Sequence, residues 1–378
     1  MPRLNDTVRR LSALRQELGH GVIDPACKDR LSDLGRFGTN PGALRGRVYV
    51  PQSIGKASAL VVVLHGCTQS AAGYDHGAGW SRLADEHGFA LLYPEQQPAN
   101  NANRCFNWFQ AGDTRRGAGE ALSIRQMVAA MVARHPIDPA RIFVTGLSAG
   151  GAMASVMLAA YPEIFAGGAI IAGLPYGTAT SIPQAFDRMR AHGGPPATVL
   201  GQLVRDASEH TGPWPTISIW HGDSDAVVNH ANAAMIVEQW RQIHGVEREP
   251  VSQVVNGHVR RAWLDVHGRE VIEEYQIQGL GHGTPLSTAG VEACGKAGPF
   301  MLEAGISSTH RIAAFWGLLS SPAPEKTGAT PASPASPRHH VGPRRSTALQ
   351  EAPRASRPVS NGVGQAIEDA LRAAGLIR

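Results

Sequence analysis

The chain alternates short apolar runs, which have the pattern of buried strands, with longer stretches in which apolar residues recur at helical spacing. The run from Leu60 to Leu64 is apolar at every position and mostly β-branched, as expected for a strand buried on both faces. Helical spacing predicts one helix over 120–134 and a second, rich in small residues, over about 149–160. Further strands are predicted at 47–50, 89–93, 141–145, 169–172, 216–220 and 273–278. This alternation predicts the α/β class, with a mostly parallel central sheet and helices on both of its faces.

Three segments differ in their pattern, and we expect them to be structurally distinct. Residues 1–45 are predicted to form a helical accessory segment, because one helical face would carry Leu4, Val8, Leu11, Leu14 and Leu18. Residues 46–320 hold the alternating strands and helices and are predicted to be one α/β domain; its looser stretch between 176 and 215 suggests a cap or wall. Residues 321–378 are rich in Pro, Ala and Arg, which predicts a disordered tail, with a short terminal helix as an alternative for the last residues.

Composition narrows the class of protein. With 378 residues and 43% hydrophobic content, the chain can bury a large core. The formal net charge of +4 comes with arginines near both ends, which are normally solvated, so nucleic-acid binding is not expected. The first residues form no continuous apolar stretch, so no signal peptide is visible, and no window is long enough for a membrane span. Four cysteines without a CxxC pair favour neither a disulfide scaffold nor a zinc cluster.

The segment Gly146–Gly150 has the form G-x-S-x-G and lies between a predicted strand and a predicted helix. A strand–turn–helix context is what a nucleophile elbow requires, because a sharp turn then presents the serine hydroxyl at the edge of the sheet. The start of the helix adds a favourable dipole and free N–H groups. Ser148 is therefore the candidate nucleophile, the alternative being an ordinary glycine-rich turn with a passive serine.

A serine nucleophile needs a base, and in this strand–turn–helix arrangement an acid and then a histidine follow it along the chain. Asp225 is the preferred acid because it follows the strand at 216–220; Asp223 is the alternative. His282 is the preferred base, since it follows a late strand on a glycine-flanked turn. The competing histidines are His221, His258, His267 and His310.

An acyl-transfer site also needs N–H donors for the oxyanion of the intermediate. The backbone N–H of Ala149 and that of Cys67, in the loop after the strand at 60–64, are the candidates; alternatively this loop only turns the chain. Ser148 would attack an ester carbonyl while His282 takes its proton and Asp225 orients the imidazole. Water would then hydrolyse the acyl-enzyme, so no metal and no organic cofactor is expected.

Five motifs in this order resemble the polyhydroxybutyrate (PHB) depolymerase family of esterases: HGCTQ (65–69), RCFNWF (104–109), GLSAGGAM (146–153), WHGDSD (220–225) and GHG (281–283). The resemblance covers about residues 46–317. It implies an α/β-hydrolase fold, a catalytic domain at 46–320, and hydrolysis of short hydroxyacyl esters or polyesters. It also implies that Ser148, Asp225 and His282 are the nucleophile, the acid and the base.

The resemblance further implies a disulfide between Cys67 and Cys105 beside the oxyanion loop, the alternative being two buried thiols. Trp108 and Phe109 are expected to line the acyl pocket, unless they are core residues. Family members are often extracellular, but without a visible export signal a cytoplasmic location stays open, as does the oligomeric state. No separate polymer-binding domain is visible, which favours soluble or amorphous short-chain esters over crystalline polymer.

Two kinds of alternative function remain at this point. A feruloyl or acetylxylan-type esterase, or a serine peptidase, would use the same three residues on another substrate. A non-catalytic coat protein of polyester granules would instead use the terminal amphipathic segments. A passive coat does not require a complete set of nucleophile, base and acid, so the pattern favours hydrolysis.

Overall fold

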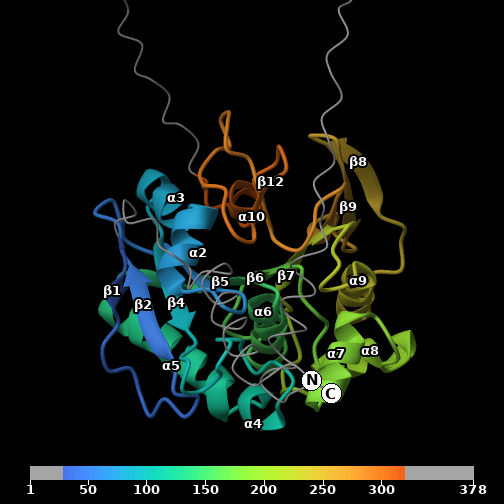
Figure 1. Ribbon diagram of the computed structural model, residues 1–378, viewed down its shortest axis with the longest axis horizontal. Coiled ribbons are helices and arrows are strands. Elements are labelled where there is room, and N and C mark those ends of the chain that lie inside the picture. Colours follow the sequence, from blue (N-terminus) through green and yellow to red (C-terminus); the bar gives the residue numbers. More distant parts are fainter. Residues whose placement is uncertain (1–28, 320–378) are drawn as a thin grey trace, which may run out of the picture.

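The structure, a computed structural model, describes residues 29–319 and is built around one ten-stranded sheet with the order β1-β2-β4-β3-β5-β6-β7-β10-β9-β8 (Figure 1). Six neighbouring strands are parallel: β4 (Ala90–Glu95), β3 (Ser58–Leu64), β5 (Ile137–Leu147), β6 (Gly167–Ile171), β7 (Thr216–Gly222) and β10 (Glu270–Ile277). Antiparallel strands complete both edges: β1 (Ser32–Asp33) and β2 (Arg45–Tyr49), then β9 (His258–Leu264) and β8 (Val251–Val255). The predicted mostly parallel sheet is confirmed.

Helices pack on both faces of this sheet, as predicted (Figure 1). Residues of α5 (Gly119–Arg134), α6 (Ala149–Ala160) and α9 (Ala231–His244) form one apolar core with the sheet. The opposite core contains residues of α2 (Ala71–Ala78), α3 (Trp80–His87) and α10 (Ser308–Phe315). Strand β3 faces both cores, since Leu60 and Val62 belong to the first and Val61 and Val63 to the second. Its uniform hydrophobicity follows from this double burial.

Shorter elements lie at the rim of the sheet. They are α4 (Ala111–Thr114), α7 (Ile182–Met189), α8 (Leu200–Arg205), a 3₁₀ turn at Ala197–Val199, and a small second sheet of β11 (Thr284–Leu286) and β12 (Met301–Glu303). The helices α7 and α8 occupy the stretch between 176 and 215, where the pattern predicted a cap or wall. None of the helices between residues 29 and 319 is long and apolar enough to cross a membrane.

Two boundaries differ from the predicted ones. The strand expected to end before Pro94 continues as β4 to Glu95, because Pro94 lies where β4 pairs only with β2 and its missing N–H leaves the pairing with β3 intact. In the predicted accessory segment, residues 29–45 form no helix but mostly loop with the short strand β1, and Leu31 and Leu34 are buried against the main body. The predicted helix near the N-terminus and the tail at 321–378 lie outside the described residues, so the division into three segments stays a prediction.

A buried glutamate holds the long connection from β4 to α4, residues 96–110. Glu120, in the first turn of α5, is fully buried, and its carboxyl group accepts hydrogen bonds from Gln96 Nε2 (2.6 Å) and from Asn107 Nδ2 (2.7 Å) and backbone N–H (2.9 Å). Burial is the main cause that raises the pKa of Glu120 from its ordinary value of 4.5 to about 8. The same connection is joined to the loop after β3 by a disulfide between Cys67 and Cys105.

The shifted pKa of Glu120 predicts a pH-dependent stability. Between pH 4.5 and about 8 the folded chain keeps a proton on Glu120 that the unfolded chain releases. The stability that this retained proton contributes is therefore fully present below the pKa of Glu120 in the unfolded chain, and it is lost as the pH rises through the pKa in the folded chain. Between the two values the free energy of unfolding falls by at most about 1.4 kcal/mol per pH unit. We expect Glu120→Gln to remove this component of the slope, as measured by denaturant unfolding at a series of pH values.

The exposed Glu249 provides the matched control, because Glu249→Gln removes the same group without a buried network. Its slope should equal that of the parent protein. Equal slopes for the parent protein and Glu120→Gln would contradict the role of Glu120.

Candidate active site

Ser148 lies on a sharp bend between β5 and α6. Its backbone has φ 57° and ψ −119°, a conformation that a side-chain-bearing residue seldom adopts. The flanking glycines make this bend sterically feasible: a Cβ on Gly146 would lie 2.3 Å from the carbonyl oxygen of Gly150, and one on Gly150 would lie 2.3 Å from that of Leu64. The G-x-S-x-G pattern therefore follows from close backbone approach, and the bend turns the serine out of the sheet.

Asp225 and His282 are brought together by the pairing of two strands. Asp225 follows β7 and His282 follows β10, and these strands are parallel neighbours, so their carboxyl ends meet at one edge of the sheet. His282 Nδ1 lies 2.7 Å from Asp225 Oδ2, and the two side chains are 5% and 0% exposed. Nδ1–H donates to the carboxylate, which leaves Nε2 as the basic nitrogen of the ring.

The Asp225 carboxylate is buried and stays ionised because of its contacts. Its Oδ1 accepts the backbone N–H groups of Val227 (2.8 Å) and Val228 (2.9 Å). Burial alone would raise the pKa of Asp225, but hydrogen bonds from His221 and His282 outweigh it and hold this pKa well below its ordinary value. The carboxylate is thus a fixed negative charge next to Nδ1 of the His282 imidazole.

The alternative acid, Asp223, has a different set of partners. Its carboxylate accepts the N–H of Gly279 at 2.7 Å, while its own N–H donates to Ile277 O at 3.1 Å. Asp223 therefore ties the loop after β7 to the loop that carries His282. Of the competing histidines, His221 reaches Asp225, His258 contacts Ala304 O, and His267 and His310 lie on the β9–β10 turn and on α10.

The loop after β3 is held rigidly beside Ser148. His65 is buried; its Nδ1–H donates to Gly66 O (2.8 Å), and its Nε2 accepts the N–H of Gln96 (3.1 Å). Gln69 Oε1 accepts the N–H of Gly66 at 2.8 Å. Together with the Cys67–Cys105 disulfide, which the family resemblance implies, these contacts fix the peptide groups on either side of Gly66.

One cavity of about 270 Å³ joins these parts, because Ser148, Ala149, Cys67 and His282 all line it. The backbone N–H groups predicted to bind an oxyanion therefore belong to the same cavity as the serine and the histidine. Trp108 also lines it and meets Phe109 edge-to-face, with ring centroids 5.4 Å apart. Trp108 packs against the apolar core as well, so its pocket and core roles coexist.

Sequence reasoning predicted a cap or wall between 176 and 215, but it named none of the α7 residues that line this cavity. Ile182, Phe186 and Met189 lie on one face of α7 at helical spacing and line the cavity. Their i, i+4, i+7 spacing was a usable signal, but it lies in the stretch where the pattern loosens. Sequence reasoning also did not predict that Glu120 and His65 hold the loops beside the cavity. For His65, its place in the HGCTQ motif could have indicated such a role.

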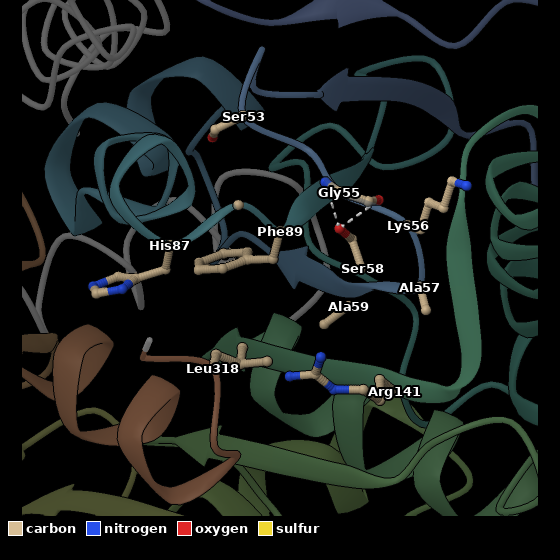
Figure 2. Close-up of a pocket in the computed structure, with 11 residues that line it drawn as sticks. Ser53, Gly55, Lys56, Ala57, Ser58, Ala59, His87, Phe89, Arg141 and Leu318 are labelled. Atoms are coloured by element: carbon tan, nitrogen blue, oxygen red, sulfur yellow. Dashed lines mark hydrogen bonds between the residues drawn. The ribbon is translucent and has the colours of Figure 1, made fainter. Parts of the chain in front are cut away.

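A second cavity, of about 260 Å³, lies at the opposite edge of the sheet, near the amino ends of β3 and β4 (Figure 2). Its side chains include Lys56, His87 and Arg141, and its Ser58 hydroxyl is bonded to the backbone of Gly55 rather than to a base. Among the described residues, no group of three or more His, Cys, Asp or Glu is arranged to hold a metal ion. The cavity at Ser148 is therefore the candidate active site.

A family model and several relatives match this chain. The family model described as Esterase PHB depolymerase matches residues 46–257. Poly(3-hydroxyalkanoate) depolymerase C of Paucimonas lemoignei is 47% identical over 292 residues, which are 76% of this chain and 70% of that protein. An acetylxylan esterase of Coprinopsis cinerea is 33% identical over 274 residues, or 70% of this chain and 72% of that protein.

A solved structure, the acetyl xylan esterase from Aspergillus awamori, superposes with a TM-score of 0.64 at 22% identity and covers 76% of this chain and 99% of that one. At this identity the likeness concerns the fold, which is that of the α/β-hydrolase esterases. The family match and the 47% identical relative go further. The chain belongs to the PHB depolymerase family of esterases, which are carboxylic ester hydrolases.

Proposed function

We propose that this protein hydrolyses short-chain hydroxyacyl esters, with Ser148 as nucleophile, His282 as base and Asp225 as the acid that orients it. One observation carries the proposal: the strained Ser148 shares a cavity with His282, and the Nδ1 of His282 is hydrogen-bonded to the buried carboxylate of Asp225. A passive serine needs neither the bend nor the charged partner below the ring.

The chemistry then proceeds in two halves. Ser148 Oγ attacks the ester carbonyl as its proton passes to His282 Nε2, and the imidazolium is stabilised by Asp225. The backbone N–H groups of Cys67 and Ala149 bind the oxyanion, supported by the N-terminus of α6. His282 returns the proton to the leaving alcohol, and a water activated by the same Nε2 hydrolyses the acyl-enzyme.

The size and the apolar lining of the cavity favour a substrate with a small acyl group that carries apolar substituents. Its volume of about 270 Å³ is slightly below the usual range of ligand pockets, and Phe186, Met189 and Val228 line it. The relative with 47% identity is a poly(3-hydroxyalkanoate) depolymerase, whose name indicates a polyester of hydroxyacyl units. We therefore place (hydroxy)acyl esters and oligoesters of that kind first among the substrates.

A second candidate substrate class has support from other relatives. Acetylxylan and feruloyl esterases match this chain at 26–33% identity. A panel of 3-hydroxybutyrate oligomers, acetylated xylan, methyl ferulate and a peptide substrate separates these functions from one another and from a peptidase. Granule binding without hydrolysis of any ester would support the coat-protein alternative instead.

The nucleophile is tested independently of the substrate. A fluorophosphonate should modify the parent protein, and peptide mapping should locate the label on Ser148. Ser148→Ala should lose the label and at least about 10³-fold in kcat on p-nitrophenyl acetate, because the covalent path is removed. The exposed Ser252 of β8 offers a control, since Ser252→Ala should keep both properties. Label at another serine, or activity retained by Ser148→Ala, would overturn the proposal.

Because Phe186 of α7 lines the cavity, its substitution should allow the site to accept a longer acyl group. Phe186→Ala should raise the ratio of kcat/KM for p-nitrophenyl octanoate over acetate by about tenfold, because the removed ring leaves apolar room in the cavity. Phe186→Leu, which keeps most of the apolar volume, should change the ratio less. A ratio unchanged by Phe186→Ala in a folded protein would show that α7 does not contact the acyl chain.

A further inference from the structure

His221 is a buried histidine next to the proposed acid, outside the three residues of the proposed mechanism. It lies near the end of β7, where it is paired with Gln276 of β10, and its side chain is 2% exposed. Its Nε2 lies 2.8 Å from Val228 O and 3.3 Å from Asp225 Oδ2. The carboxylate oxygen that accepts His282 therefore also faces a second imidazole.

The contacts of His221 and Asp225 converge on the backbone of Val228. The carbonyl of Val228 accepts from His221, while its N–H donates to Asp225 Oδ1 at 2.9 Å. Val228 is fully buried and lines the cavity. One peptide segment is thus held at both ends, and the orientation of the Asp225 carboxyl group is coupled to the position of the cavity wall.

The ring of His221 has one usable donor in this position. Its Nδ1 is buried and has no hydrogen-bond partner within residues 29–319, so the tautomer with the proton on Nε2 fits the contacts. The Nε2–H group then lies between the carbonyl oxygen of Val228 and the carboxylate of Asp225. The titratable groups that face this carboxylate are His221 from β7 and His282 from the loop after β10.

We propose that His221 is a positioning residue for the ester hydrolysis, acting through Asp225 on His282. It holds the carboxyl group in the orientation that His282 Nδ1 requires, and it takes up part of the negative charge on Oδ2. A carboxylate shared in this way attracts the proton of the imidazolium less strongly. This inference rests on the proposed function, because it assigns a role relative to His282 and Asp225.

Two substitutions separate the hydrogen bond from the volume of the ring. Met at position 221 fills similar space without an N–H, whereas the amide nitrogen of Gln lies at about the reach of Nε2 and carries two N–H groups. His221→Met should lower kcat on p-nitrophenyl acetate by about tenfold with little change in KM. The acid limb of its pH profile of kcat/KM should move to higher pH by roughly half a unit or more, since Asp225 then stabilises the His282 imidazolium more strongly. His221→Gln should restore most of the rate and the position of the limb.

His244 provides the matched control. Its Nε2 also lies within hydrogen-bond distance of a backbone carbonyl, Pro215 O at 3.0 Å, but it stands at the end of α9 and does not contact Asp225. His244→Met should lower the thermal midpoint and leave the acid limb in place. A purely structural role for His221 would give the same result for His221→Met.

Each outcome decides the inference. It is overturned if His221→Met keeps the parent kcat or leaves the acid limb in place, or if His221→Gln is no better than His221→Met. If His221→Met does not fold, His221→Asn replaces it, because its shorter amide cannot reach both acceptors; equal activity of the Asn and Gln variants then overturns the inference. Fluorophosphonate labelling of Ser148 in the parent protein is the separate check. If it fails, the proposed function fails with it, whereas labelling together with an inert position 221 removes only the role of His221.

Discussion

The burial of one carboxylate governs the geometry of the site. Asp225 has lost its water, and a buried charge of this kind is tolerated only when several donors replace the solvent. Two backbone N–H groups on Oδ1 and the two imidazoles at Oδ2 provide that replacement. The loop after β7 must take the path that brings Val227 and Val228 back to the carboxylate. The electrostatics of a single side chain therefore fix the backbone of the loop, the orientation of His282 and part of the cavity wall.

The other side of the cavity is held by neutral contacts. His65 links the loop after β3 to the residue that follows β4, and the Cys67–Cys105 disulfide joins the same two connections covalently. Glu120 lies behind them and binds Asn107 and Gln96 from the interior. Because these segments come from three different parts of the chain, the loop that carries the N–H of Cys67 is tied to the rest of the fold from several sides. Such preorganisation is what electrostatic stabilisation of an oxyanion requires.

The cavity combines this polar floor with an apolar wall. The polar floor consists of Ser148, His282 and the backbone of Cys67 and Ala149. It lies at the carboxyl ends of the parallel strands, where peptide N–H groups and loop side chains meet. The wall formed by α7 is a short amphipathic helix whose Ile182, Phe186 and Met189 lie over the site. A family that keeps the floor and varies the wall can retain ester hydrolysis while the substrate changes.

The sequence alone was sufficient where the physical cause is local. The bend at Ser148 could be predicted because adjacent glycines, a preceding strand and a following helix are all encoded within about twenty residues. The buried strands could be predicted as well, since a short apolar run rich in β-branched residues favours a strand buried on both faces. By contrast, Asp225 and His282 are 57 positions apart, and only the parallel pairing of β7 with β10 brings them within hydrogen-bond distance. The contact of His221 with Asp225, the burial of Glu120 and the wall of α7 were likewise decided by tertiary packing, because a side chain's partners depend on how distant segments meet, which no local pattern records.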